Sequence, residues 1–186
     1  MMVINRENIL RYAQKYDEQY NKTEDERIEK KMKELLKKHR YFNREDFIQV
    51  GRWKSKRTTR WFNKNNANEV KDITSFCFDK ENNICEETRI KQLIKLWGVG
   101  YPVASALLHF AFPERYPIMD FRTIWSLGWE QPSNYNFDFW QRYCEKIRVI
   151  ATQLGLPIRT VDKALWKYSK ENQQLGQKCS RLARGR

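Results

Sequence analysis

The chain has 186 residues, and its 36 Lys and Arg against 23 Asp and Glu give a formal net charge of +13. This excess favours a polyanionic partner such as nucleic acid, although ribosome-associated and nonspecifically adhesive proteins show it too. No apolar run reaches the roughly 18 residues of a membrane span, and polar residues follow Met1-Met2-Val3-Ile4 at once, so no signal peptide is expected. We therefore expect an intracellular, cytoplasmic monomer that does not contact a membrane.

Cysteine and histidine are too few and too scattered to predict a metal site. The four cysteines show no Cys-x-x-Cys spacing, and only two histidines are present. Such cysteines are typical of reduced cytoplasmic thiols, and we expect no zinc site. The cysteines are Cys77, Cys85, Cys144 and Cys179.

The spacing of apolar residues predicts helices along the whole chain and no strands. We expect an all-α fold of two closely packed helical lobes, forming one domain over residues 1–172. Residues 5–20 and 24–39 carry Glu and Lys at helical offsets beside a thin apolar stripe, which predicts a helical hairpin on the surface, flanking the domain over 5–40. Asn43 is expected to cap the next helix.

Residues 53–62 are predicted to form one basic helix with an aromatic residue at each end, and residues 65–68 break the helical pattern after it. In one interpretation, Lys54 and Arg57 bind phosphates of a nucleic acid while Trp53 or Trp61 stacks on an exposed base. In the other, the tryptophans belong to the core and the cations lie on the solvated face. The sequence leaves both interpretations open.

A tight reversal follows the amphipathic helices predicted at 69–78 and 87–97. Gly98-Val99-Gly100 permits positive φ and a close approach of the main chain to another molecule, while Val99 can anchor the turn in the core. The next helix, 101–112, begins with Tyr101-Pro102, and its free amides suit a phosphate. A helix-hairpin-helix motif is therefore expected at 87–112. An ordinary helix corner remains the alternative.

Residues 113–119 contain two prolines, which exclude a regular helix and predict an extended connection. Asp120 follows this connection and precedes a helix predicted at 121–128. Its position is that of a helix N-cap, and a plain cap is the simplest interpretation of an isolated Asp there.

Helices are also predicted at 137–154 and 158–171, and residues 173–186 are expected to form a basic, flexible tail. His109 lies among Leu and Phe, which favours a core histidine with its hydrogen bonds satisfied over a catalytic one. Asp162 and Trp166 are expected to form a buried polar pair.

Three segments together resemble a known superfamily. Leu-Trp-Gly-Val-Gly-Tyr-Pro-Val-Ala-Ser-Ala-Leu-Leu from Leu96, Ala-Phe-Pro at 111–113 and Ile-Met-Asp-Phe-Arg at 118–122 are similar to the helix-hairpin-helix DNA glycosylases (HhH-GPD), which include endonuclease III. The resemblance covers 93–127. It implies that Gly98 and Gly100 form a phosphate-binding hairpin, that Asp120 is the catalytic aspartate, and that Arg122 faces DNA.

The chain also departs from that family. Bifunctional members carry a lysine where this chain has Pro102, so the resemblance implies a monofunctional, hydrolytic enzyme unless another lysine attacks, for which Lys54 is the best-placed candidate. The scattered cysteines imply no iron–sulfur cluster. The resemblance further implies a monovalent cation at the hairpin and no other cofactor.

The expectation that follows is a DNA glycosylase of base excision repair, associated with the nucleoid and acting on double-stranded DNA that carries a damaged, modified or mismatched base. Such an enzyme flips the base from the duplex, and Asp120 stabilises the sugar cation as the glycosidic bond breaks. The alternatives are a non-catalytic helix-hairpin-helix DNA-binding protein, in which Asp120 is only a cap, and a basic helical protein that binds RNA or the ribosome.

Overall fold

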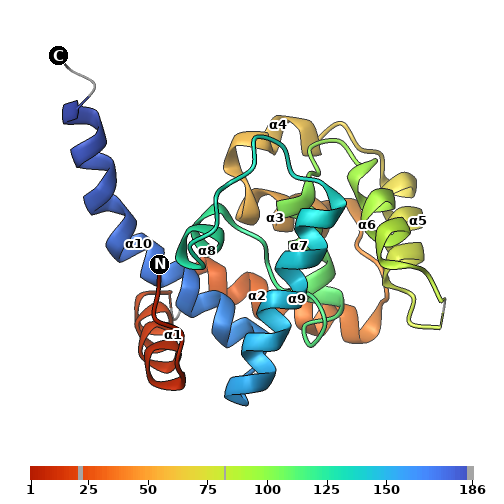
Figure 1. Cartoon of the computed structure of the whole chain (residues 1–186). Coiled ribbons are helices and arrows are strands. Elements are labelled where there is room, and N and C mark those ends of the chain that lie inside the picture. Colours follow the sequence, from red (N-terminus) through yellow and green to blue (C-terminus); the bar gives the residue numbers. More distant parts are fainter. Residues whose placement is uncertain (21–22, 82, 184–186) are drawn as a thin grey trace.

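The computed structural model describes residues 1–20, 23–81 and 83–183, and every regular element in these ranges is helical (Figure 1). The all-α prediction is thereby confirmed. None of the described helices combines the length and apolarity needed to span a membrane. The elements are α1 (Arg6–Tyr20), α2 (Glu24–Lys38), α3 (Arg44–Lys54), a 3-10 turn η1 (Lys56–Thr58), α4 (Thr59–Phe62), α5 (Ala67–Phe78), α6 (Glu86–Ile94), α7 (Tyr101–Ala111), α8 (Phe121–Ser126), α9 (Phe137–Leu154) and α10 (Ile158–Ala183).

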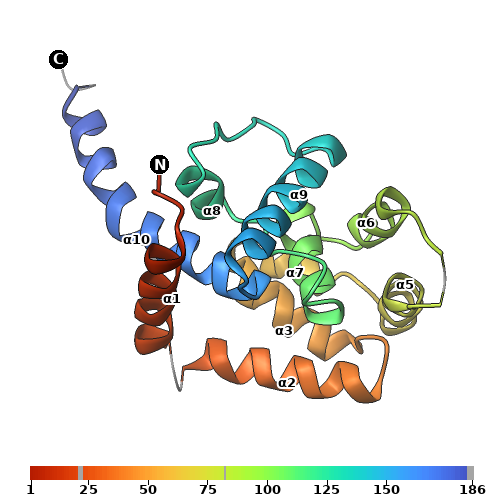
Figure 2. The ribbon, with the colours of Figure 1, turned by 60° about the horizontal axis from the view of Figure 1, so that its bottom comes forward.

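The helices pack as two adjoining groups. In one group α10 contacts α1, α8 and α9, while in the other α2, α3, α5 and α6 contact α7, and α4 packs on α3 (Figures 1 and 2). The predicted hairpin of the first two helices is wrong: α1 lies along α10, whereas α2 packs mainly on α3 and α7. The reason is that the apolar stripe of α2 is not superficial, because Ile28, Met32 and Leu36 are all buried in the core.

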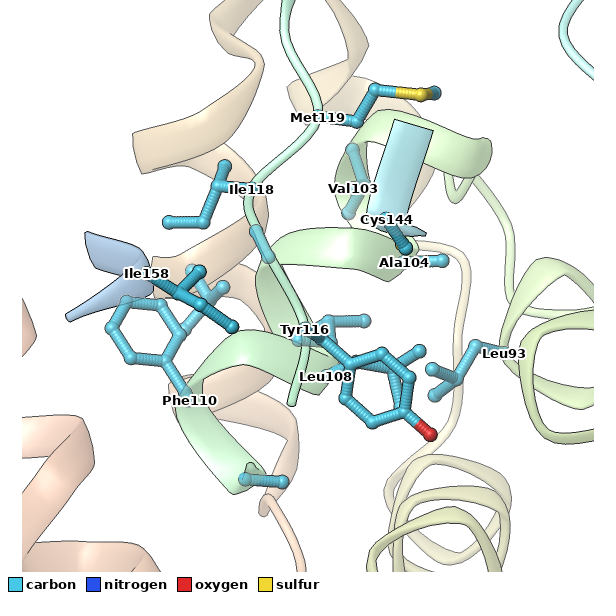
Figure 3. Close-up of a cluster of buried hydrophobic side chains, with 14 of the residues drawn as sticks. Leu93, Val103, Ala104, Leu108, Phe110, Tyr116, Ile118, Met119, Cys144 and Ile158 are labelled. Carbon is cyan, nitrogen blue, oxygen red and sulfur yellow. The ribbon is translucent and has the colours of Figure 1, made fainter. Parts of the chain in front are cut away.

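Helix α7 is the centre of the core. Every residue from Val103 to Ala111 is buried, and the small side chains of Ala104, Ser105 and Ala106 let neighbouring elements approach closely (Figure 3). A helix that is apolar on all sides must be covered on all sides. It is contacted by α2, α3, α5 and α6, and the extended segment before α8 crosses it.

Two predicted segments differ from the structure. Residues 53–62 are not one helix: α3 ends at Lys54, Ser55 takes extended dihedrals, and the chain continues through η1 into α4. The break turns α4 so that the ring of Phe62 packs against Gly51. At the other end, α10 continues as far as Ala183, through most of the stretch expected to be a flexible tail, whose last residues, 184–186, lie outside the described residues.

Candidate active site

The two glycines of the hairpin between α6 and α7 differ in conformation. One has the positive φ that the sequence permits, and the other does not. Gly98 has a φ of +86°, and a Cβ there would lie 2.8 Å from the ring of Phe62. The close approach at Gly98 is therefore to this chain's own core. Gly100 has ordinary dihedrals as the N-cap of α7, and a Cβ there would meet only Pro102, at 3.9 Å. Val99 is 6% exposed, which confirms that it anchors the turn.

Three backbone amides at this hairpin have no hydrogen-bond partner among the described residues. The N–H groups of Gly98, Gly100 and Tyr101 donate no hydrogen bond to any described residue, whereas Val99 N donates to Leu96 O at 3.1 Å. Free amides at a helix start, together with the helix dipole, favour an anion. The half-buried Tyr101 begins α7, and burial raises the pKa of its phenol although Lys91 opposes the shift.

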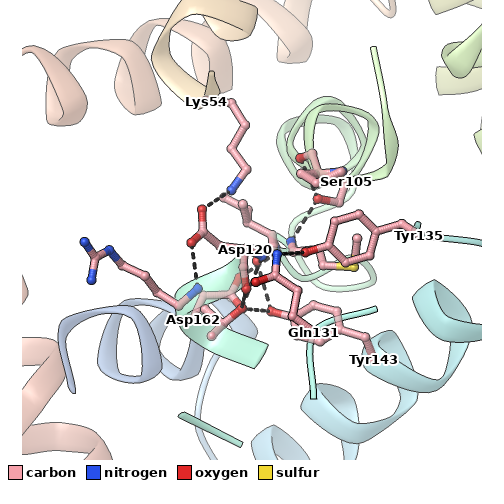
Figure 4. Close-up of polar contacts among 12 residues, drawn as sticks. Lys54, Ser105, Asp120, Gln131, Tyr135, Tyr143 and Asp162 are labelled. Carbon is pink, nitrogen blue, oxygen red and sulfur yellow. Dashed lines mark hydrogen bonds and ion pairs between the residues drawn. The ribbon is translucent and has the colours of Figure 1, made fainter. Parts of the chain in front are cut away.

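The extended segment before Asp120 is held by side chains from three helices (Figure 4). Ser105 of α7 accepts a hydrogen bond from Met119 N at 2.8 Å, and Asp162 of α10 accepts one from Ile118 N at 2.8 Å. The hydroxyl of Tyr143, from α9, donates to Ile118 O at 3.0 Å. Because an extended strand without a neighbour has unsatisfied backbone groups, these side chains fix its path and hence the position of Asp120.

Asp120 is the N-cap of α8, as predicted. Its Oδ1 accepts from Arg122 N at 3.0 Å, and Thr123 completes a capping box. Its Oδ2 has a different partner: Lys54 Nζ, 2.7 Å away (Figure 4). Lys54 is the last residue of α3, and its side chain is 7% exposed against 18% for that of Asp120. The amine and the carboxylate are thus brought together although 66 residues separate them.

The pair lies in a pocket of about 290 Å³ at the junction of the two helix groups. Of the residues predicted for a site, Trp53, Lys54, Asp120 and Arg122 line it. Trp53 is half-buried and its ring packs on Phe110, with centroids 5.5 Å apart. Tyr16, Ile118, Phe121, Thr123, Arg159, Asp162 and Trp166 complete the lining.

The pocket wall on α10 carries opposite charges. Arg159 forms an ion pair with Glu29 of α2, which lowers the pKa of Glu29 even though burial opposes ionisation. Burial raises the pKa of Asp162 to about 7, while Arg159 and the Ile118 amide oppose that rise. Asp162 Oδ1 has no hydrogen-bond partner among the described residues. The predicted partner of Asp162 was wrong: its carboxylate binds a backbone amide of the extended segment and not Trp166.

His109 is a core histidine, as predicted. It is 5% exposed, and its Nδ1 lies 2.8 Å from Tyr116 O. Burial, helped by the charge of Arg159, lowers the pKa of His109 to about 4, so the ring is neutral at pH 7.

Trp61 and Arg57 lie outside the pocket lining. Arg57 is exposed on η1, and Trp61 packs beside the hairpin. Sequence reasoning missed Ser105 and Tyr143, which position the extended segment. A signal for Ser105 existed, since a serine inside an otherwise apolar helix needs a hydrogen-bond partner.

The described residues contain no group of three or more His, Cys, Asp or Glu arranged to hold a metal ion. Comparisons with protein-family models, with curated proteins and with solved structures found no match to this chain.

Proposed function

We propose that this protein is a DNA N-glycosylase that takes a damaged, modified or mismatched base into the pocket and hydrolyses its glycosidic bond. The observation that carries the proposal is the position of Asp120, whose carboxylate lies in a pocket beyond a glycine hairpin with free amides. The pocket volume of about 290 Å³ is at the small end for ligand sites, which suits a single base. The resemblance of residues 93–127 to the helix-hairpin-helix glycosylases supports the same reaction.

Each part has a defined task in this reaction. The amides of Gly100 and Tyr101 bind a phosphate of the distorted strand, and Arg122 lies at the pocket beside Asp120. As the glycosidic bond breaks, positive charge develops on the deoxyribose, and the carboxylate of Asp120 stabilises it. Lys54 and the Arg122 amide hold that carboxylate in one orientation, so that no reorganisation is needed when the charge develops.

The contact of Lys54 with Asp120 favours a second form of this chemistry. Pro102, at the position of the family's lysine, predicts hydrolysis without strand cleavage. The amine of Lys54 nevertheless lies in the same pocket as the carboxylate, 2.7 Å from it. If Lys54 passed a proton to Asp120 and its free amine attacked C1′ of the sugar, the base would leave with a proton. Cleavage of the C1′–O4′ bond, with protonation of O4′, would then open the sugar ring and leave an imine that joins Lys54 to the DNA. Borohydride reduces such an imine to a stable adduct, so trapping separates the two forms.

The test is a panel of duplexes with different lesions, scored for strand breaks before and after hot alkali. We expect at least one duplex to break only after alkali, which reveals an abasic site. A borohydride adduct that disappears in Lys54→Ala would show that the protein uses the lyase form and not simple hydrolysis. A panel without any abasic product would contradict the glycosylase.

Asp120→Asn tests the assigned residue, because Asn keeps the cap and loses the charge. We expect excision to fall by roughly a hundredfold or more with DNA binding retained. Asp138→Asn, which removes a carboxylate from the start of α9, is the matched control and should excise normally. Retained excision by folded Asp120→Asn would remove the catalytic assignment.

Asp120→Asn also leaves the buried amine of Lys54 without its counter-charge, which costs about 3–5 kcal/mol. The double variant Lys54→Gln/Asp120→Asn removes both charges and shows whether lost activity is lost folding.

A non-catalytic DNA-binding protein is the second candidate. It is favoured by one observation: both carboxylate oxygens of Asp120 already accept hydrogen bonds within the protein, from Arg122 N and Lys54 Nζ. In that case Asp120→Asn changes stability but no DNA chemistry, and wild type forms no abasic sites.

A further inference from the structure

Trp97, in the turn between α6 and α7, is held on the surface. Its side chain is 53% exposed, although Leu96 before it and Val99 after it are buried. The ring lies nearly parallel to that of Trp61, with an interplanar angle of 12° and centroids 6.0 Å apart. Neither tryptophan lines the pocket that contains Asp120. The two indoles form a stacked pair beside the hairpin, which we call the tryptophan platform.

The buried side chain of Asn65 holds the backbone of Trp97. Asn65 is 2% exposed, and its Oδ1 accepts from Trp97 N at 2.7 Å. Its Nδ2 donates to Trp97 O at 3.0 Å and to Phe62 O at 2.9 Å. Both backbone polar groups of Trp97 are therefore fixed to the turn that follows Trp61. An exposed ring held by its own backbone in this way is preorganised for a ligand.

The charges around the platform decide the class of ligand. Lys64 Nζ lies 4.2 Å from the Trp61 ring centroid and 5.1 Å from that of Trp97, and the Arg60 guanidinium lies 5.0 Å from Trp61. Neither cation forms an ion pair with a described residue. A cationic ligand such as a methylated lysine would be repelled. A flat aromatic ligand attached to negative charge fits, and an unpaired nucleotide has both features.

We propose that the tryptophan platform stacks an unpaired base of DNA, outside the pocket, while the neighbouring hairpin amides bind the phosphates of the same strand. This rests on the proposed function for its choice of DNA as the partner. It implies that the preferred DNA contains an unpaired base in addition to the base that enters the pocket, as at a bulge or at a junction of single and double strand.

The experiment compares two DNAs of equal charge at one salt concentration, both with an undamaged duplex part. One is a duplex with a single-stranded thymidine extension, and the other carries the same extension with abasic sugar analogues in place of the bases. Stacking on an aromatic side chain contributes about 1–3 kcal/mol per base, so wild type should bind the first roughly tenfold more tightly or better. In Trp97→Ala the ratio should fall to about one, while Trp97→Phe should retain part of it.

Trp129→Ala is the matched control, because Trp129 is half-buried like Trp61, packs on Phe139 and has Arg142 5.6 Å from its ring. It should keep the wild-type ratio. Equal binding of the two DNAs by wild type, or an unchanged ratio in folded Trp97→Ala, would overturn the proposal. Because the duplex part of both DNAs is undamaged and neither offers a damaged base to excise, this result is independent of excision: a chain that keeps the ratio but forms no abasic sites contradicts the glycosylase alone.

Discussion

Gly98 and Gly100 are separated by one valine, yet a methyl group added to each would meet different surroundings. At Gly98 the positive φ disfavours any side chain, and the ring of Phe62 occupies the space. At Gly100 the dihedrals suit any residue, and no atom lies closer to an added Cβ than 3.9 Å. One glycine therefore serves folding, whereas the other leaves an open approach to the amides of α7.

Alanine substitutions should separate these two roles. Gly98→Ala is expected to lower the free energy of unfolding by about 1–3 kcal/mol, because it forces a left-handed conformation and a clash. Gly100→Ala should lower stability by no more than about 1 kcal/mol, because alanine is a poorer N-cap than glycine, but weaken DNA binding equally for all sequences, because backbone contacts carry no base information. Urea denaturation and binding titrations measure both effects. Unchanged DNA affinity in Gly100→Ala would show that the strand does not approach these amides.

At the scale of elements, the extended segment from Tyr116 to Asp120 depends on hydroxyl and carboxylate groups that reach it from helices. Ser105 is the clearest case, since its Oγ accepts from Met119 N inside the core. Thr74 gives a matched arrangement far from the pocket, because its Oγ1 accepts from the buried Phe42 N at 3.0 Å. The two hydroxyls satisfy the same kind of group, but only the first lies beside Asp120.

Ser105→Ala and Thr74→Val should therefore destabilise the fold alike and affect catalysis differently. Each leaves a buried backbone N–H unsatisfied, at a cost of about 1–3 kcal/mol measured by chemical denaturation. Excision per folded molecule should fall in Ser105→Ala, since the path of the chain into Asp120 is loosened, and stay normal in Thr74→Val. Equal excision by the two variants would contradict a positioning role for Ser105.

Local signals in the sequence predicted the elements well where caps were explicit. Helix α9 has its predicted bounds because Asn136 caps its start and Gly155, with a φ of +60°, ends it. The break at Ser55 had no such signal, since neither glycine nor proline marks it and the packing of Phe62 decides it. The contact of Lys54 with Asp120 could not be predicted either, because it depends on how α3 lies against the start of α8.

At the scale of the whole molecule, acidic residues neutralise the positive charges in some regions and not in others. The acidic residues of the ion pairs lie mainly on α1, α2 and α6, together with Glu171 at α10. From the end of α3 to the turn after α4, apart from Lys54, the cations form no ion pair with a described residue. These are Arg52, Lys56, Arg57, Arg60 and Lys64. The unbalanced region runs from the pocket to the hairpin, where the phosphates of a bound strand would lie.

Binding of duplex DNA should therefore weaken steeply with salt. If roughly four to six phosphates are neutralised, the logarithm of the affinity should fall against the logarithm of the salt concentration with a slope of about −3 to −6. Titrations at several salt concentrations measure this slope. Replacing Arg57 by Ala should make it shallower by roughly one, and a slope near zero in wild type would contradict an electrostatic interface.

The contact of α1 with α10 joins the first helix of the chain to the last, and this sets an order of assembly. Helices α2 to α7 are contiguous in the chain and contact one another, so they have their partners early in synthesis. The pocket does not, because Arg159, Asp162 and Trp166 come from α10, and Tyr16 of α1 packs on Trp166 with ring centroids 5.6 Å apart. A nascent chain that ended before α10 would carry Lys54 and Asp120 without the wall that encloses them. The complete wall of the pocket is thus acquired late in translation.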